Sequence, residues 1–231
     1  MRGAAAVRRL AMTTGLCAAL AISYPGASWA KDPPPRVSPE GLELKTQTKE
    51  RLVYLKPGVT FSQYKRVAIL DCYVEFSKDW LRDYNNSQRD PSRKIKDSDI
   101  ERAKTNLSAQ FKKVFTNELQ GTGGYQVSDT AAPDVLVLRP GLINIQVSAP
   151  DLMAPGRSVT YAQSAGQMTL YLELWDSATN TILARVMDTR ADPQAYGQRS
   201  SSVSNRAAAE RIMKSWAVEL HNALDAARGQ P

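Results

Sequence analysis

The chain has 231 residues, of which 42% are hydrophobic and 23% are charged, and its formal net charge is +7. This composition is that of a globular protein and excludes collagen-like, coiled-coil and wholly disordered chains. One histidine and two cysteines provide too few ligands for a zinc or haem site, and we expect no cofactor. The length favours one or two small domains with a substantial core.

The first thirty residues have the pattern of a secretory signal peptide. Three arginines precede the uncharged run 10–23, and the small residues Ser28 and Ala30 follow it. We therefore expect cleavage between Ala30 and Lys31. A retained membrane anchor is the less favoured alternative, because the run is short for a bilayer span and Pro25 interrupts it.

The two cysteines have different expected fates. Cys17 lies inside the apolar run, and Leu16 stands where a lipobox requires a small residue, so an outer-membrane lipoprotein is less favoured than a periplasmic or secreted protein. Cys72 is the only cysteine of the mature chain, and we expect it to be buried and inert on the apolar face of a strand. An internal disulfide is therefore not expected.

Export also changes the charge balance. Removing three arginines and no acid lowers the net charge from +7 to +4. This weakens the case for nucleic-acid binding, and we expect no nucleic-acid partner. Peripheral membrane contact stays open, whereas no transmembrane helix is expected in the mature chain.

The first half of the mature chain predicts a leader, two strands and a helix. Residues 31–50 are Pro-rich and then charged, which predicts a flexible leader, and a single domain follows over residues 51–228. Strands are expected at 52–55 and 67–76, the second with one apolar face, and residues 77–96 are expected to form a polar loop. The apolar face of the second strand holds Ala68, Leu70, Cys72, Val74 and Phe76. Ser98 and Glu101 have capping-box spacing and begin a helix that ends near Leu119.

The second half predicts more strands and a closing helix. Strands are expected at 125–127 and 135–147, the second with a bend or bulge at Pro140 and an edge position nearby. Residues 149–165 are expected to be a mobile loop. The strands 167–175 and 181–186 flank a short Asp/Asn turn and predict a β-hairpin, and a final helix is expected from about 205 to 227.

The order of these elements favours an α+β domain. Strands joined by short turns indicate a mostly antiparallel or mixed β-sheet, and each predicted helix carries a single apolar stripe. We therefore expect a two-layer arrangement with two amphipathic helices on one face of the sheet.

Several segments resemble the domain of unknown function 3313 family. The resemblance rests on the sequence LVYLKPGV at 52–59, FSQYKRV at 61–67, WDSAT at 175–179 and Ser215-Trp216-Ala217 in the closing helix. It covers roughly residues 40–228. The resemblance implies an exported bacterial envelope protein of unknown function, often a lipoprotein, and it supplies no catalytic residues to carry over.

No constellation of catalytic residues stands out, so an enzymatic function is not favoured. The only histidine, His221, is expected on the surface of the closing helix. The candidate interaction face consists of Tyr171, Glu173 and Trp175 on the second face of the hairpin, with Tyr73 joining from the first strong strand. The favoured alternative is that these are ordinary strand residues, which flanking loops cover.

Two functions stay in view. The first is a non-catalytic exported envelope or periplasmic protein that acts by binding or assembly, with an envelope protein or a second copy of itself as the partner. A homo-oligomer would use the edge near Pro140 or the aromatic face. The alternative is a carboxylate-dependent hydrolase acting on an envelope polymer, which requires two facing acids near the loop 149–165.

Overall fold

The computed structural model describes residues 33–121, 124–147, 166–192 and 202–229. The fold belongs to the compact unit Pro35–Pro231. The expected signal peptide, its cleavage site between Ala30 and Lys31, and the expected mobile loop 149–165 lie outside the described residues.

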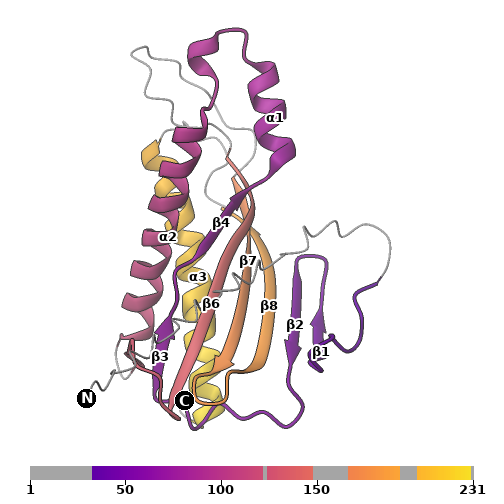
Figure 1. The fold of residues 1–231 in the computed structure, drawn as a ribbon, viewed down its shortest axis with the longest axis vertical. Helices are drawn as coiled ribbons and strands as arrows, with labels where there is room; N and C mark the ends of the chain where they lie inside the picture. The colour runs from indigo at the N-terminus through magenta and orange to yellow at the C-terminus, as the bar shows by residue number, and fades with distance from the viewer. Residues whose placement is uncertain (1–32, 122–123, 148–165, 193–201, 230–231) are drawn as a thin grey trace, which may run out of the picture. The chain divides into compact units, whose positions relative to one another are not determined.

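Eight strands form one mixed sheet in the order β1-β2-β8-β7-β6-β3-β5, with β4 also paired to β6 (Figure 1). The strands β6, β7 and β8 form an antiparallel meander, and β3 and β4 run parallel to β6. The expected α+β fold with a mixed sheet is confirmed. The bounds are β1 (Glu43–Gln47), β2 (Arg51–Leu55), β3 (Arg66–Ile69), β4 (Tyr73–Phe76), β5 (Gln126–Val127), β6 (Val135–Gln146), β7 (Gln167–Asp176) and β8 (Thr181–Ala191).

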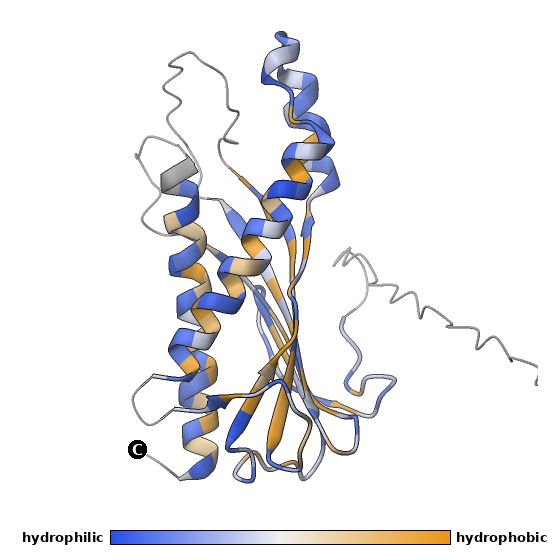
Figure 2. Cartoon of the chain, turned by 60° about the vertical axis from the view of Figure 1, so that its left-hand side comes forward, coloured by the Kyte–Doolittle hydropathy of each residue, from blue (hydrophilic) through white to orange (hydrophobic). Residues whose placement is uncertain are grey.

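The described residues hold three α-helices, one more than the sequence predicts. The long helices α2 (Asp97–Leu119) and α3 (Ser202–Arg228) pack against each other, and Figure 2 shows them beside the strands with hydrophobic residues interspersed among polar ones. The segment 77–96 is not the expected loop, because it contains α1 (Lys78–Ser87) and the short 3-10 helix η1 (Pro91–Arg93). The side chain of Ser77 accepts a hydrogen bond from the Trp80 N–H and so caps α1.

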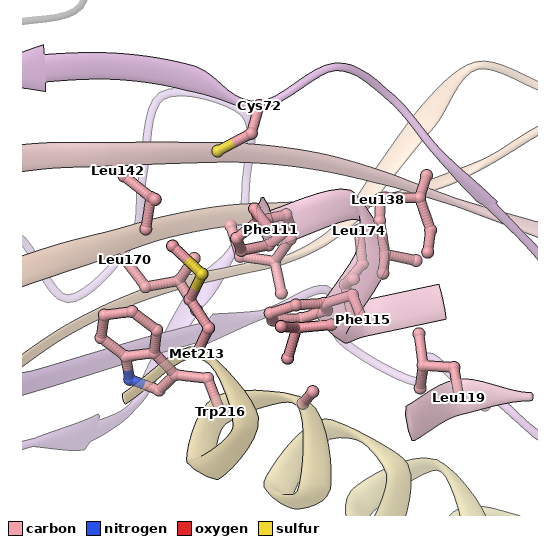
Figure 3. Close-up of a cluster of buried hydrophobic side chains, with 14 of the residues drawn as sticks. Cys72, Phe111, Phe115, Leu119, Leu138, Leu142, Leu170, Leu174, Met213 and Trp216 are labelled. Carbon is pink, nitrogen blue, oxygen red and sulfur yellow. The ribbon is translucent and has the colours of Figure 1, made fainter. Parts of the chain in front are cut away.

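One main cluster of buried side chains joins the sheet to α2 and α3 (Figure 3). The rings of Phe111 and Phe115 stack with their centroids 3.9 Å apart, and Met213 and Trp216 of α3 belong to the same cluster. Cys72 is buried here, as expected, and burial raises the pKa of its thiol to about 12. An inert cysteine is the consequence, because the reactive thiolate form is rare at neutral pH.

The expected strand 67–76 is in fact two strands with a break between them. The ladder from β3 to β6 ends at Ile69 opposite Leu138, and the ladder from β4 begins at Tyr73 opposite Gly141. The break shifts the alternation of faces, so Leu70 is 44% exposed instead of lying in the apolar row with Cys72. The predicted apolar face is therefore wrong before the break, where Val67 and Ile69 are buried and Ala68 and Leu70 are not, and correct from Cys72 to Phe76.

Pro140 lies beside this break, and the bend or bulge expected at Pro140 is not found there. It lies in the middle of β6, an interior strand, but Pro140 itself pairs only with Leu172 of β7, because the ladder to β3 ends at Leu138 and the ladder to β4 begins at Gly141. The expected edge position is therefore present only locally, at the gap between β3 and β4. The irregular pairing of β6 with β7 falls later, between Ile143 and Gln146, where Asn144 has a φ of 52°. Proline cannot donate to a ladder, and the gap between β3 and β4 falls beside it.

Two boundaries near the first strands and the first long helix also differ from expectation. The leader expected over 31–50 contains β1, and Leu42 just before it is buried, so this part of the leader belongs to the sheet. The helix α2 begins at Asp97, and the carboxylate of Asp99 accepts the Lys96 N–H at 3.0 Å. This bond replaces the Ser98–Glu101 capping box that the sequence predicts.

Candidate functional site

The candidate interaction residues of β7 share one face of the sheet, as their spacing predicts. Tyr171, Glu173 and Trp175 alternate with Leu172 and Leu174, which are buried in the main cluster with side chains of α2 and α3. The three candidates are only half-buried. They therefore point away from the main cluster.

Tyr73 lies in the same row of side chains as Tyr171. Gly141 of β6 pairs with Tyr73 on one side and with Tyr171 on the other. A Cβ atom placed on Gly141 would meet the Cβ atoms of both tyrosines at 3.8 Å. The structure thus brings the two predicted tyrosines to either side of a residue without a side chain. Tyr73 is the more open of the pair, at 40% exposure.

Glu173 is the centre of a hydrogen-bond network on this face, and its side chain is only 12% exposed. The Tyr171 hydroxyl donates to one of its oxygens at 2.7 Å, and the Trp175 indole N–H donates to the other at 3.1 Å. Arg185 of β8 adds two bonds, from Nε at 3.1 Å and from Nη2 at 2.9 Å. Both oxygens of this carboxylate are therefore engaged.

Arginine side chains pack on the aromatic rings of this network. The guanidinium of Arg139 lies 4.9 Å from the centroid of Trp175, and that of Arg185 lies 5.8 Å from the centroid of Tyr171. Burial raises the pKa of the Tyr171 hydroxyl, and its bond to Glu173 raises it further. The tyrosine therefore stays protonated and acts as a donor.

The segment before β1 reaches this network through Glu40. Its carboxylate receives two bonds from Arg185, at 3.1 and 2.9 Å, and one from the Ser38 hydroxyl at 2.8 Å. The bond from Arg185 lowers the pKa of Glu40 to about 2. Arg185 is thus shared between two carboxylates that come from distant parts of the sequence.

A second, smaller apolar cluster lies beside the network. It consists of Leu42, Leu52, Tyr54 and Ile182, with Trp175 packed against it. The Tyr54 hydroxyl also donates to the Pro35 carbonyl at 2.9 Å. The segment 35–44 therefore covers part of the face that the sequence leaves open, in agreement with the alternative that flanking segments cover these aromatic residues.

A second charged group, which the sequence does not reveal, joins α3 to the sheet. Arg190 of β8 donates to Glu219 of α3 at 2.5 Å and to Asp188 at 2.7 Å, and Arg51 of β2 also pairs with Glu219. Its members are scattered along the sequence, and no local motif links them. Asp192, just after β8, forms a similar pair with Arg211 of α3. These acids serve packing between elements.

His221 is not the surface residue that the sequence predicts. Its side chain is 13% exposed, packs edge-on against Tyr125 with ring centroids 5.8 Å apart, and lies 3.4 Å from Asp225. The Tyr125 hydroxyl donates to the other oxygen of Asp225 at 3.1 Å. Within the described part of the chain, no serine or cysteine is hydrogen-bonded to His221 or Asp225, so no nucleophile relay is formed there.

The histidine, cysteine, aspartate and glutamate side chains of the described part of the chain form no group of three that would hold a metal ion. None of its helices is long and apolar enough to cross a membrane.

The sequence model of the DUF3313 family, whose description is "protein of unknown function", matches residues 37–220. No curated protein matches the chain. Among solved structures, the PelC dodecamer from Paraburkholderia phytofirmans is 13% identical with a TM-score of 0.38, over 74% of this chain and 97% of that one. A protein from Xanthomonas campestris is 12% identical with a TM-score of 0.37, over 74% and 89%. A hypothetical protein from Chlamydia trachomatis is 10% identical with a TM-score of 0.37, over 69% and 98%. These are distant similarities.

Proposed function

The chain belongs to the DUF3313 family of proteins of unknown function. We propose that it is a non-catalytic envelope protein that acts by binding or assembly. The observation that carries the proposal is that the carboxylates on the candidate face are already held in ion pairs and hydrogen bonds. Glu173 and Glu40 both pair with Arg185, and Glu173 accepts two further donors. A general base or nucleophile needs a carboxylate that is free to react. The hydrolase alternative gains no support from these residues.

The surface proposed for binding lies at the Tyr73 end of the face. Tyr73 and Leu70 flank the break between β3 and β4, and both are large hydrophobic residues with 40% and 44% exposure. Large exposed apolar side chains can mark an interaction surface. We take α2 and α3 to cover the opposite face of the sheet. The partner is an envelope protein or a second copy of the chain.

We propose an exported location on the basis of the signal-peptide pattern of the first thirty residues. Export with cleavage would place the mature protein in the periplasm or outside the cell. N-terminal sequencing of the protein from an envelope fraction should return Lys31 as the first residue. A mature protein that still begins at Met1 would overturn this part of the proposal.

The binding surface is tested by capture of partners from envelope extract. The double variant Leu70→Ser/Tyr73→Ser should no longer capture the partner protein. If the partner is a second copy of the chain, the variant should instead show a lower molecular mass in light scattering than the unchanged protein. Val37→Ser is the matched control, because Val37 is also a large exposed hydrophobic residue but lies in the segment before β1. Equal capture by both variants and the unchanged protein would reject this surface.

A further inference from the structure

The turn between α1 and α2 carries four exposed cations, which we call the basic tip: Arg89, Arg93, Lys94 and Lys96. Figure 1 shows this turn beyond the end of β4, at the top of the view, and Figure 2 shows the same region mostly in hydrophilic colours. Residues 89–97 contain these four cations and two acids, so the segment has a net charge of +2. The basic tip is therefore a positively charged part of the surface.

The two acids of this segment are used within it and leave most of the cations without a counter-charge. The carboxylate of Asp90 lies 3.9 Å from Arg93. Asp97 is in the first turn of α2, where a negative charge interacts favourably with the helix dipole. Three cations of the basic tip form no salt bridge with any described residue: Arg89, Lys94 and Lys96.

The fold holds the two lysines on one side of the chain. Asn85 of α1 bonds both backbone groups of Ile95, donating to its carbonyl at 3.0 Å and accepting its N–H at 2.8 Å. Ile95 is buried, and its neighbours Lys94 and Lys96 both have extended backbone, with ψ of 137° and 159°. Alternate residues of an extended chain point to the same side. Because Ile95 points into the fold, the two lysines point outwards together.

A bilayer that contains anionic phospholipids fits this arrangement. Segments with four or more lysines and arginines are attracted to such a surface, because it carries a negative potential. The cations of the basic tip come from a turn, a 3-10 helix and an extended segment, so no single concave site gathers them. A lipid surface offers a separate phosphate to each of them. The geometry thus favours a broad anionic surface over a small anion.

We propose that the basic tip docks the protein on the surface of an anionic phospholipid bilayer. This goes beyond the binding surface at Leu70 and Tyr73, because it uses the turn between α1 and α2. Each cation near such a surface strengthens binding about fivefold. The attachment is reversible and weakens with salt, because the Debye length falls from about 30 Å at 0.01 M to about 8 Å at physiological ionic strength.

The test is co-sedimentation of the protein, purified from the envelope fraction, with lipid vesicles at low ionic strength. The protein should sediment with vesicles of mixed phosphatidylcholine and phosphatidylglycerol, and much less with phosphatidylcholine alone, because only the mixture is anionic. Added salt should release it. Equal sedimentation with both kinds of vesicle, or none with the mixture, would overturn the proposal.

Two triple variants connect the binding to the basic tip. Arg89→Gln/Lys94→Gln/Lys96→Gln removes the three cations without a salt bridge and should lower the vesicle partition coefficient about 100-fold. The control Lys49→Gln/Lys56→Gln/Lys65→Gln removes the same charge from three exposed lysines elsewhere and should bind within about twofold of the parent. All six side chains are exposed, so both variants should keep the thermal midpoint of the parent protein. An equal loss in both variants would show an effect of net charge alone and would reject the basic tip.

Two further readouts separate this proposal from its neighbours. Parent and variants share the same N-terminus, so any membrane contact of that segment is common to all of them. The variant of the basic tip should still capture the partner of the Leu70 and Tyr73 surface, so failure of one proposal is distinguishable from failure of the other. A titration with the soluble acidic polysaccharide polygalacturonate tests the other class of polyanion. Binding of this polymer through the basic tip, without sedimentation on vesicles, would overturn docking on a bilayer.

Discussion

Replacing Arg185 with methionine should cost the fold about 2–3 kcal/mol. The Arg185 and Glu173 side chains are only 17% and 12% exposed, and removing one partner of a buried ion pair costs about 3–5 kcal/mol. The cost is lower here because Glu173 keeps the donors of Tyr171 and Trp175, and Arg139 stays 3.9 Å away. Methionine preserves the apolar stem, so the loss reports on the charge and its hydrogen bonds.

Urea denaturation of the parent, Arg185→Met, Glu173→Gln and the double variant measures this cost as a double-mutant cycle. The two substitutions together should cost about 1–2 kcal/mol less than the sum of the single effects, because the double variant has no buried unpaired charge. A thermal scan should show a fall of roughly 5–10 °C for Arg185→Met. If Arg185→Met lowers the free energy of unfolding by less than about 0.5 kcal/mol, the size expected for an exposed ion pair, this reasoning is refuted.

Three further outcomes are expected. Tyr64→Phe removes the 2.7 Å bond to Asp176 at the hairpin turn and should cost about 1–2 kcal/mol in urea; an unchanged midpoint would contradict this. Cys72 should react with Ellman's reagent only after unfolding, because burial raises the pKa of its thiol to about 12; rapid labelling of the native protein would count against burial. The carboxyl of Glu40 has a pKa of about 2 in the fold against 4.5 ordinarily, so its contribution is present above pH 4.5 and is lost as the pH falls towards 2. The fall in the free energy of unfolding that Glu40 causes at low pH should be below about 1 kcal/mol, because its side chain is 40% exposed. Glu40→Gln should abolish this fall. The control Glu43→Gln, which changes another exposed glutamate, should show the same fall as the parent protein.

The sequence predicts the β7–β8 hairpin correctly because its signals are local. Strict alternation defines the two strands, and the Asp176 carboxylate accepts the N–H groups of Ala178 and Thr179 within the turn. Helix α1 escapes prediction because it is short and polar overall, and its apolar side, formed by Trp80, Leu81 and Tyr84, contains no buried residue. A serine cap and a few aromatic contacts form it, and such signals are indistinguishable from those of a polar loop until the packing partner is known.

The candidate face shows the same division between local and distant information. The alternation of Tyr171 and Trp175 follows from the period of a strand, so their common side is predictable. The residues that cover them are not predictable from the sequence. Arg185 reaches Glu173 through the pairing of β8 with β7, and Glu40 reaches Arg185 through the course of the segment before β1. The position of Tyr73 near Tyr171 likewise depends on the strand order around Gly141.

The pairing of β2 constrains the order in which the sheet is completed. Apart from the neighbouring β1, its ladder partner is β8, the last strand among the described residues. The meander β6–β7–β8 forms from contacts close in sequence, whereas β2 has to wait until almost the whole chain is available. A ribosome-bound chain that stops before Thr181 therefore holds β1 and β2 without their neighbour, with Leu52 and Tyr54 exposed to chaperones and proteases.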